Sequence, residues 1–243
     1  MRNKVLLALL GLGLSAHAPS CQERIEPVYS IWDVTLGQPV AQVPDADVGE
    51  IACGTAGGPP GQILASFSEF QTCPPEQSGL REIAFSYDDE QDYIALAREV
   101  QYKFLQGGTS VFAHPVIVSL LVDPAGVVQG RRIVTDNRIS DHDRRSAVTL
   151  MRNFKARYGK WALSCADVPM KEGEQPVGNQ FIHELCTGQS PDGHTLIAIE
   201  ASYLRKKGQR AVSQETQEVN AGYFESQTRY EEVLTPYAPM TAP

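Results

Sequence analysis

The second half of the chain carries its clearest β-strand pattern. Residues 115–122 (PVIVSLLV) are rich in β-branched side chains, which strands favour. The next four residues, 123–126 (DPAG), have Asp at the first position, Pro at the second and Gly at the fourth, as type I turns do. Residues 127–135 then return, so this region predicts a β-hairpin.

A helix and a run of strands are predicted after this hairpin. Residues 140–143 (SDHD) form the Asp version of a capping box, and apolar side chains then recur at i, i+4, i+7 and i+11. These apolar positions are Ala147, Met151, Phe154 and Tyr158. We expect Gly159 to end the helix in a left-handed conformation. Strands are expected at about 161–166, 180–186, 195–204 and 222–234, with a turn at 190–193.

The first half contains shorter elements. In chain order we expect a strand at 29–34, a turn at 54–61 (GTAGGPPG), a helix through Ile63, Phe67 and Phe70 that ends near Cys73, a strand at 80–87 and a helix from 88 or 89 to about 105. Together with the hairpin, helix and strands of the second half, these elements imply an α+β fold. We expect an antiparallel sheet with the helices packed on one of its faces and two disulfides.

The N-terminus has the three parts of a secretory signal. Arg2 and Lys4 precede ten apolar or Gly residues at 5–14, and small residues with one Pro follow at 15–20. The apolar run is shorter than the roughly 20 residues that cross a bilayer. We therefore expect residues 1–20 to be a signal peptide and the mature protein to be exported, to the periplasm or another part of the cell envelope.

Cys21 leaves the mode of anchorage open. Residues 16–18 (AHA) fit an ordinary signal-peptidase site, although Pro19 would follow the cut. Cys21 with its preceding residues instead resembles a lipobox, from which Ala18 and Pro19 depart. The chain has five cysteines, and a lipid on Cys21 would leave an even number to pair. Contact with a membrane is expected only through that lipid.

The remaining four cysteines are expected to form two disulfides. Pairing by proximity in sequence gives Cys53–Cys73 and Cys165–Cys186. Each bridge closes a loop of about 20 residues and would stabilise the fold by about 3 kcal/mol. Zinc is disfavoured because the sequence has no Cys-x-x-Cys and no nearby His pair at ligand spacing. We expect no metal and no cofactor.

The charge of the chain limits the partners that we expect, and its pattern of predicted elements suggests two halves and a tail. The net charge is −8, and loss of Arg2 and Lys4 with the signal would lower it to −10. Nucleic acid is excluded as a partner, because its binding depends on Lys and Arg that neutralise phosphates. We expect an N-terminal α+β half at 21–110, a C-terminal hairpin, helix and sheet half at 111–234, and a flexible Pro-rich tail at 235–243.

Two histidines are the candidates for catalysis. His142 lies between Asp141 and Asp143, and His114 comes at the start of a predicted strand. A His oriented by a carboxylate can activate a nucleophile, which would make the protein a periplasmic hydrolase. However, the capping box already accounts for residues 140–143. The sequence also has neither Gly-x-Ser-x-Gly nor Ser-x-x-Lys.

Two other motifs are incomplete. His183-Glu184 begins like the zinc-protease motif His-Glu-x-x-His, but the second His is absent and the segment is predicted to be a strand. The glycine-rich residues 54–61 could surround a phosphate, but they lack the Gly-Lys-Ser/Thr ending of a phosphate-binding loop. We interpret both segments as structural.

A candidate binding face lies on the last strands. The one basic cluster of this acidic chain, residues 205–210, is typical of a solvated hairpin tip and could contact an acidic partner. Aromatic residues of the last strand and its expected neighbour could extend this face, although at least half of them should pack internally. The candidate face comprises Tyr203, Arg205, Lys206, Lys207, Tyr223, Phe224 and Tyr230.

Three segments carry a resemblance to known sequences. Residues 53–60, 85–89 (FSYDD) and 222–226 (GYFES) together resemble a group of uncharacterised exported proteins of alphaproteobacteria. The resemblance covers most of the mature chain and implies export, but it brings no activity. More remotely, the strand–helix modules that end in Tyr-Gly are similar to small envelope lipoprotein modules that bind other proteins, a likeness that transfers no site.

The function expected from the sequence is therefore that of a binding protein. We expect a non-catalytic cell-envelope protein that binds another protein or an envelope polymer. The alternative is a periplasmic hydrolase with His114 or His142 as the general base.

Overall fold

A computed structural model describes residues 29–87, 109–138, 141–209, 211–212, 219–220 and 223–240. The expected signal peptide at 1–20, Cys21 and the helix expected at about 88–105 lie outside these residues.

The fold is mostly antiparallel sheet with few helices. The strands are β1 (Ile51–Cys53), β2 (Ile63–Leu64), β3 (Arg81–Phe85), β4 (Ser110–Val111), β5 (His114–Val122), β6 (Val128–Thr135), β7 (Ser164–Asp167), β8 (Glu174–Gln175), β9 (Ile182–Gln189), β10 (Thr195–Lys206), β11 (Ala211–Val212), β12 (Val219–Asn220) and β13 (Glu225–Leu234). The α-helices are α2 (Asp141–Ser146) and α3 (Leu150–Arg157), and the 3₁₀ helices are η1 (Val40–Gln42), η2 (Asp45–Asp47), η3 (Phe67–Thr72), η4 (Ala147–Thr149) and η5 (Gly159–Trp161).

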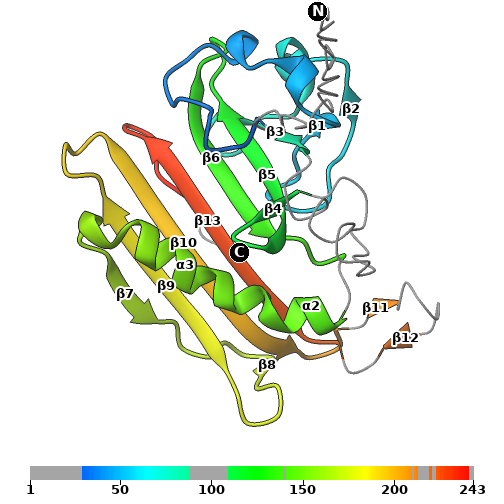
Figure 1. The fold of residues 1–243 in the computed structure, drawn as a ribbon. Helices are drawn as coiled ribbons and strands as arrows, with labels where there is room; N and C mark the ends of the chain where they lie inside the picture. The colour runs from blue at the N-terminus through cyan, green and yellow to red at the C-terminus, as the bar shows by residue number, and fades with distance from the viewer. Residues whose placement is uncertain are drawn as a thin grey trace, which may run out of the picture.

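One large sheet crosses the boundary between the two halves expected from the sequence. Its strand order is β2-β1-β3-β5-β6-β13-β10-β9-β7, with β4 beside β5 and β8 beside β10. The last strand, β13, pairs on one side with β10 and on the other with β6, where Arg229–Val233 faces Gly130–Val134. Figure 1 shows β13 between these two neighbours. The C-terminal strand therefore joins the N-terminal part of the sheet to the later strands.

The β5–β6 hairpin is confirmed, and one carboxylate organises its turn. Asp123 Oδ1 accepts hydrogen bonds from the backbone N–H of Ala125 and of Val127, each at 2.9 Å. Gly126 has a φ of 82°, a conformation that a side chain would oppose. The local sequence therefore determines both the turn and the pairing that follows from it.

The helical segment from α2 to α3 contacts β10 and β13. The ring of Phe154 stacks on that of Tyr230 with 4.6 Å between centroids, and Thr228 Oγ1 donates to the carbonyl of Ala147 at 2.8 Å. In Figure 1, α2 and α3 run across β9, β10 and β13. That all helices share one face of the sheet stays a prediction.

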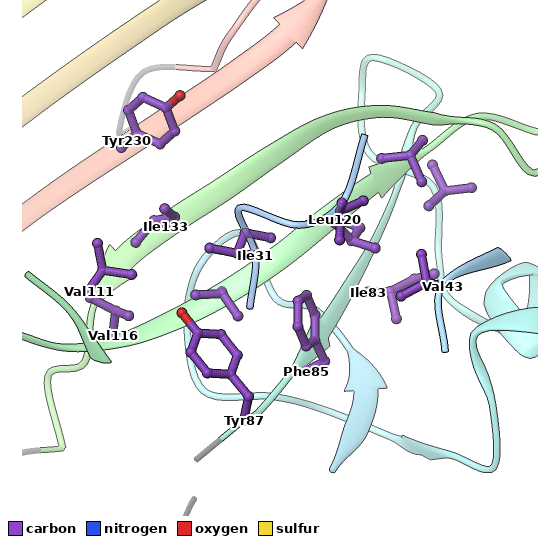
Figure 2. Close-up of a cluster of buried hydrophobic side chains, with 14 of the residues drawn as sticks. Ile31, Val43, Ile83, Phe85, Tyr87, Val111, Val116, Leu120, Ile133 and Tyr230 are labelled. Carbon is purple, nitrogen blue, oxygen red and sulfur yellow. The ribbon is translucent and has the colours of Figure 1, made fainter. Parts of the chain in front are cut away.

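One part of the hydrophobic core lies between the β3–β5–β6 region and the irregular N-terminal segment, and another lies between α3 and strands β10 and β13. Figure 2 shows Ile31 and Val43 from that segment pointing toward Ile83 and Leu120 of the sheet. Ile31, Ile83 and Leu120 are fully buried. Burial of each such side chain stabilises the fold by about 1.5–3 kcal/mol.

Both expected disulfides are confirmed. Cys53–Cys73 ties β1 to the segment after η3, and both of its cysteines are buried. Cys165–Cys186 joins β7 to β9, where the two residues are direct partners in the strand register. Cys165 is exposed and Cys186 is buried.

Three expected local features are wrong. Residues 31–34 form turns rather than a strand, because Asp33 Oδ2 accepts hydrogen bonds from both the N–H and the hydroxyl of Ser30 at 2.8 Å. The helix expected through Ile63 is replaced by β2 and η3, and the Ile63 side chain is 66% exposed. After α3, Gly159 starts a 3₁₀ helix, and the left-handed residue is Ala162, with a φ of 49°.

The C-terminal segment folds back on the sheet as far as it is described. The backbone N–H of Met240 donates to Glu231 Oε1 at 2.9 Å, and the carbonyl of Met240 accepts a hydrogen bond from Arg229 Nε at 3.3 Å. Tyr237 packs against a small cluster that contains Leu121 and Val233. These contacts tie residues 237–240 to β13, whereas their composition favoured a flexible tail.

Candidate binding site

The strands β9, β10 and β13 have one apolar and one polar face. Ile199, Ala201 and Tyr230 lie in the core on the side of α3. Because side chains alternate along a strand, the residues between them point to the opposite face. His183 of β9 and Glu200 of β10 therefore occupy this second face, and both are about nine-tenths buried.

His183 and Glu200 form a buried hydrogen-bonded pair. The imidazole Nε2 lies 2.7 Å from Glu200 Oε1. In the tautomer with the proton on Nε2, this nitrogen donates to the Glu200 carboxylate. The other ring nitrogen, Nδ1, is buried without a hydrogen-bond partner among the described residues. A buried polar atom without a partner is costly and calls for an explanation, such as a ligand that supplies the missing bond.

This pair lies at a polar pocket with a volume of about 260 Å³. Side chains from β9, β10, the start of β13 and the surrounding loops converge on it. The pocket is lined by Asn137, Arg144, Lys171, Glu174, His183, Glu200, Ser202, Lys206, Gln209, Tyr223, Glu225, Ser226, Gln227 and Arg229. Every one of these side chains carries a polar group.

Glu225 organises one side of the polar pocket. Its Oε1 accepts a hydrogen bond from the hydroxyl of Ser202 at 3.2 Å, and its Oε2 lies 3.0 Å from Lys206 Nζ. Nearby, the guanidinium of Arg144 lies 4.3 Å from the centre of the Tyr223 ring, which is a cation–π distance. These contacts fix the directions of the polar side chains before any ligand binds.

Arg229 links the polar pocket to a buried charged network. Its Nη1 donates to the carbonyl of Ala56 at 2.7 Å and its Nη2 to Glu231 Oε2 at 3.1 Å, while its Nε donates to Met240. Burial lowers the pKa of Arg229, and the nearby charge of Arg132 lowers it further. Since each guanidinium nitrogen has a protein partner, Arg229 shapes the pocket wall.

Arg132 is the centre of the charged network. It is fully buried and contacts three carboxylates: Glu76 at 2.6 Å, Glu82 at 2.9 Å and Glu231 at 2.8 Å. Burial alone would lower the pKa of Arg132, but the hydrogen bond to Glu76 and the charges of Glu82 and Glu231 raise it above its ordinary value. The Arg132 guanidinium therefore stays positively charged.

The glycine-rich loop covers this network. Glu82 accepts hydrogen bonds from the backbone N–H of Ala56 at 2.5 Å and of Gly57 at 3.0 Å. A bound phosphate would need these two amides as hydrogen-bond donors. The Glu82 carboxylate already accepts both hydrogen bonds and so occupies the place that a phosphate would take. This geometry supports the structural interpretation of residues 54–61.

An apolar groove of about 360 Å³ adjoins the polar pocket. Met170 and Ile182 line this groove and are 48% and 37% exposed. His183 belongs to the linings of both cavities. His183 is the one residue that the two linings share.

The candidate binding face is partly wrong. Tyr230 is fully buried and Phe224 is 7% exposed, so neither can form an exposed aromatic surface. Tyr203 packs against Phe224 with 5.3 Å between ring centroids. Tyr223 and Lys206 line the polar pocket, Lys207 lies in the turn after β10, and Arg205 is half-buried.

The structure describes the surroundings of only one of the two expected catalytic histidines, His114. His114 Nδ1 lies 2.9 Å from the carbonyl of Phe112, and its Nε2 lies 3.0 Å from Thr149 Oγ1. Thr149 in turn donates to the carbonyl of Ser146 at 2.6 Å, so its hydroxyl proton already has an acceptor. His142 lies in α2, but its side chain is outside the described part of the structure. Neither position supplies an activated nucleophile among the described side chains.

One group of potential metal ligands is already bonded. Sulfur atoms of Cys165 and Cys186 lie close to a carboxylate oxygen of Glu184. The two sulfurs form a disulfide and offer no thiolate. His183 and Glu184 are neighbours on β9 and point to opposite faces, which explains why the zinc-protease motif fails here.

The sequence interpretation missed the His183–Glu200 pair. The turn at 190–193 was expected, and counting back from it places His183 opposite Ser202 and Leu185 opposite Glu200. Side chains two residues apart on neighbouring strands can reach each other diagonally. The register of this hairpin is thus the signal that could have revealed the pair.

Comparison with protein-family models, curated proteins and solved structures finds no match to the chain. The resemblance to exported alphaproteobacterial proteins therefore stays a prediction. Within the described ranges, no helix is both long and apolar enough to span a bilayer.

Proposed function

We propose that the protein is a non-catalytic cell-envelope protein that binds a partner protein or an envelope polymer through the polar pocket. The observation that supports this proposal is the buried His183 Nδ1, which has no hydrogen-bond partner among the described residues and lies at a pocket lined by polar side chains. A ligand group that bonds to Nδ1 would remove the cost of leaving this atom unsatisfied.

The hydrogen bonding of the pocket favours binding over catalysis. Activation of a serine needs a hydrogen bond from its hydroxyl to a general base. The hydroxyl of Ser202 instead donates to Glu225, and no described hydroxyl group is hydrogen-bonded to the free nitrogen of His183, Nδ1. The described contacts therefore resemble a preformed recognition site more than a nucleophile and its base.

Export and anchorage belong to the same proposal. Two disulfides fit a protein that folds in an oxidising compartment. Removal of residues 1–20 would deliver the chain to the envelope, and a lipid on Cys21 would tether it there. A Cys21→Ser variant that stays membrane-associated with an unchanged lipid content would contradict the tether.

Affinity capture from crosslinked envelopes tests the proposed function. The bait is the tagged full-length protein, compared with a Tyr223→Ala/Gln227→Ala variant that removes two pocket side chains. Gln71→Ala, an exposed residue of η3, is the matched control. We expect wild type and the control to capture the same component and the pocket variant to lose it.

Two results would contradict the proposal. If the pocket variant captures that component as well as wild type does, the polar pocket is not the binding site. If the purified protein captures nothing but turns over a substrate, it is an enzyme.

A further inference from the structure

We infer that the polar pocket takes an uncharged, polyhydroxylated group, one sugar residue of a glycan. This inference rests on the proposed function and specifies its ligand. It follows from three properties of the pocket: its polar side chains, the near balance of the charges that line it, and His183 Nδ1, which has no hydrogen-bond partner within the described part of the chain.

The first property is that every side chain lining the pocket carries a polar group. Asn137, Gln209 and Gln227 contribute amides, which both donate and accept hydrogen bonds, while Ser202 and Ser226 contribute hydroxyls. A ligand that displaces water from such walls must replace most of the lost hydrogen bonds. An apolar ligand cannot do so, whereas a ring with hydroxyl groups on most of its carbons can.

The second property is the charge balance of the walls. Three carboxylates and four basic side chains line the pocket, so their formal charges nearly cancel. Lys206 is paired with Glu225 within the pocket. A ligand with a net charge would gain little from a nearly balanced site and would lose its own hydration. An uncharged ligand avoids this cost.

The third property is the environment of His183. With Nε2 donating to Glu200, Nδ1 accepts a hydrogen bond when the ring is neutral and donates one when the ring is protonated. A hydroxyl group both donates and accepts, so it can satisfy Nδ1 in either state. A carboxylate could satisfy only the protonated ring and an ammonium only the neutral one.

The size of the pocket suits a single residue of a glycan. Its volume of about 260 Å³ lies just below the usual range for small-molecule sites, which begins near 300 Å³. A polymer would therefore enter by one residue.

Titration calorimetry with matched oligosaccharides tests the inference on the purified full-length protein. The neutral probes are tetramers of N-acetylglucosamine and of galactose, and their charged counterparts are tetramers of glucosamine and of galacturonate. We expect at least one neutral probe to bind, at least about tenfold more tightly than its charged counterpart. Binding should weaken about tenfold in His183→Gln and in Gln227→Ala and stay unchanged in Gln71→Ala.

Gln227 is half-buried, and its side chain makes no hydrogen bond among those described, so Gln227→Ala decides the test if His183→Gln fails to fold. Tighter binding of a charged probe, or no binding of either neutral probe, would overturn the inference. In both cases the proposed function would still stand if envelope capture depends on the pocket. Equal binding to wild type and Gln227→Ala would place the glycan outside the pocket and overturn the inference as well.

Discussion

Arg132 shows how a single side chain connects distant parts of this chain. It is fully buried and pairs with carboxylates from β3, β13 and the segment before β3. Removal of one partner from a buried ion pair typically costs 3–5 kcal/mol, because the other charge is left without compensation. Here three carboxylates would lose their common cation.

Replacement of Arg132 by Met should therefore destabilise the protein strongly. We expect the free energy of unfolding to fall by about 3–5 kcal/mol, as measured by urea denaturation. Arg152→Met, at an exposed position of α3, is the control and should change it by less than about 0.5 kcal/mol. A small effect of Arg132→Met would mean that water reaches the charged network.

Tyr158 and Tyr230 form a second buried network, on the face of the sheet that α3 covers. Their hydroxyl oxygens lie 2.5 Å apart, and the hydroxyl of Tyr230 donates to Glu232 Oε2 at 2.8 Å. Burial raises the pKa of both tyrosines, and the negative charge of Glu232 raises each further. Both hydroxyls should therefore keep their protons at a pH where exposed tyrosines ionise.

This raised pKa predicts a loss of stability at alkaline pH. Above pH 10 the unfolded chain releases the Tyr158 proton while the folded chain retains it, so the unfolded state binds fewer protons and is favoured. The free energy of unfolding should fall by up to about 1.4 kcal/mol per pH unit for this residue until the folded pKa is reached. Its slope from pH 9 to 11 should be shallower in Tyr158→Phe than in wild type. Equal slopes would show that Tyr158 ionises in the folded protein.

At the level of elements, the close approach of the loop at 54–58 to the sheet requires glycine at two of its positions. Gly57 has a φ of 80°, and a Cβ there would lie 2.4 Å from Val134 Cγ2. A Cβ at Gly54 would lie 2.1 Å from Glu82 Cγ. The loop can approach the charged network only because these positions lack side chains.

Gly57→Ala should accordingly destabilise the fold by roughly 2–4 kcal/mol, from the strained φ and the steric overlap together. Gly61→Ala is the matched control, since its Cβ would lie at ordinary contact distances of 3.4–3.5 Å. Thermal unfolding of both variants measures the difference. Equal melting temperatures would show that the loop does not rest on Val134.

The two disulfides close loops of nearly equal length, with sequence separations of 20 and 21. Their entropic contributions should thus be similar, about 3 kcal/mol each. Exposure distinguishes them, because Cys165 is exposed whereas Cys53 and Cys73 are both buried.

We therefore expect Cys165–Cys186 to be reduced first at limiting dithiothreitol, as detected by alkylation and mass spectrometry. The Cys53→Ala/Cys73→Ala variant should be less stable than Cys165→Ala/Cys186→Ala by about 1 kcal/mol, because it leaves two buried sulfur positions unfilled instead of one. The reverse order of reduction would indicate that β1 and η3 open more readily than β7.

At the scale of the whole molecule, local contacts were predictable and distant ones were not. The β5–β6 hairpin followed from the turn residues 123–126, and both disulfides followed from cysteine spacing. The pairing of β13 with β6 joins residues about 100 positions apart, and no local pattern specifies it. The strand expected at 29–34 failed because the Ser30–Asp33 hydrogen bonds favour a turn over the extended backbone.

The candidate site was harder to predict for the same reason. His183 and Glu200 become partners only through the register of β9 and β10, and Arg229 joins them from the last strand. The sequence indicated Lys206 and Tyr223 by composition alone. It could not show that Tyr230, on the same strand as Arg229, points into the core.

The negative net charge of the protein is compatible with an uncharged ligand. The chain carries a net charge of −8, whereas the charges of the side chains that line the polar pocket nearly cancel. An acidic surface repels polyanions over a distance set by ionic strength. Uncharged groups approach without this repulsion, in agreement with a neutral glycan as ligand.

Site-specific photocrosslinking in the native envelope tests the central claim most directly. A benzoylphenylalanine at Tyr223 places the reactive group in the polar pocket, and one at Phe112, which is 43% exposed on the β4–β5 turn, is the control. We predict a covalent adduct with a defined envelope component at position 223 and none at 112. An adduct at 112 alone, or no adduct at 223, would contradict the assignment of the polar pocket as the binding site.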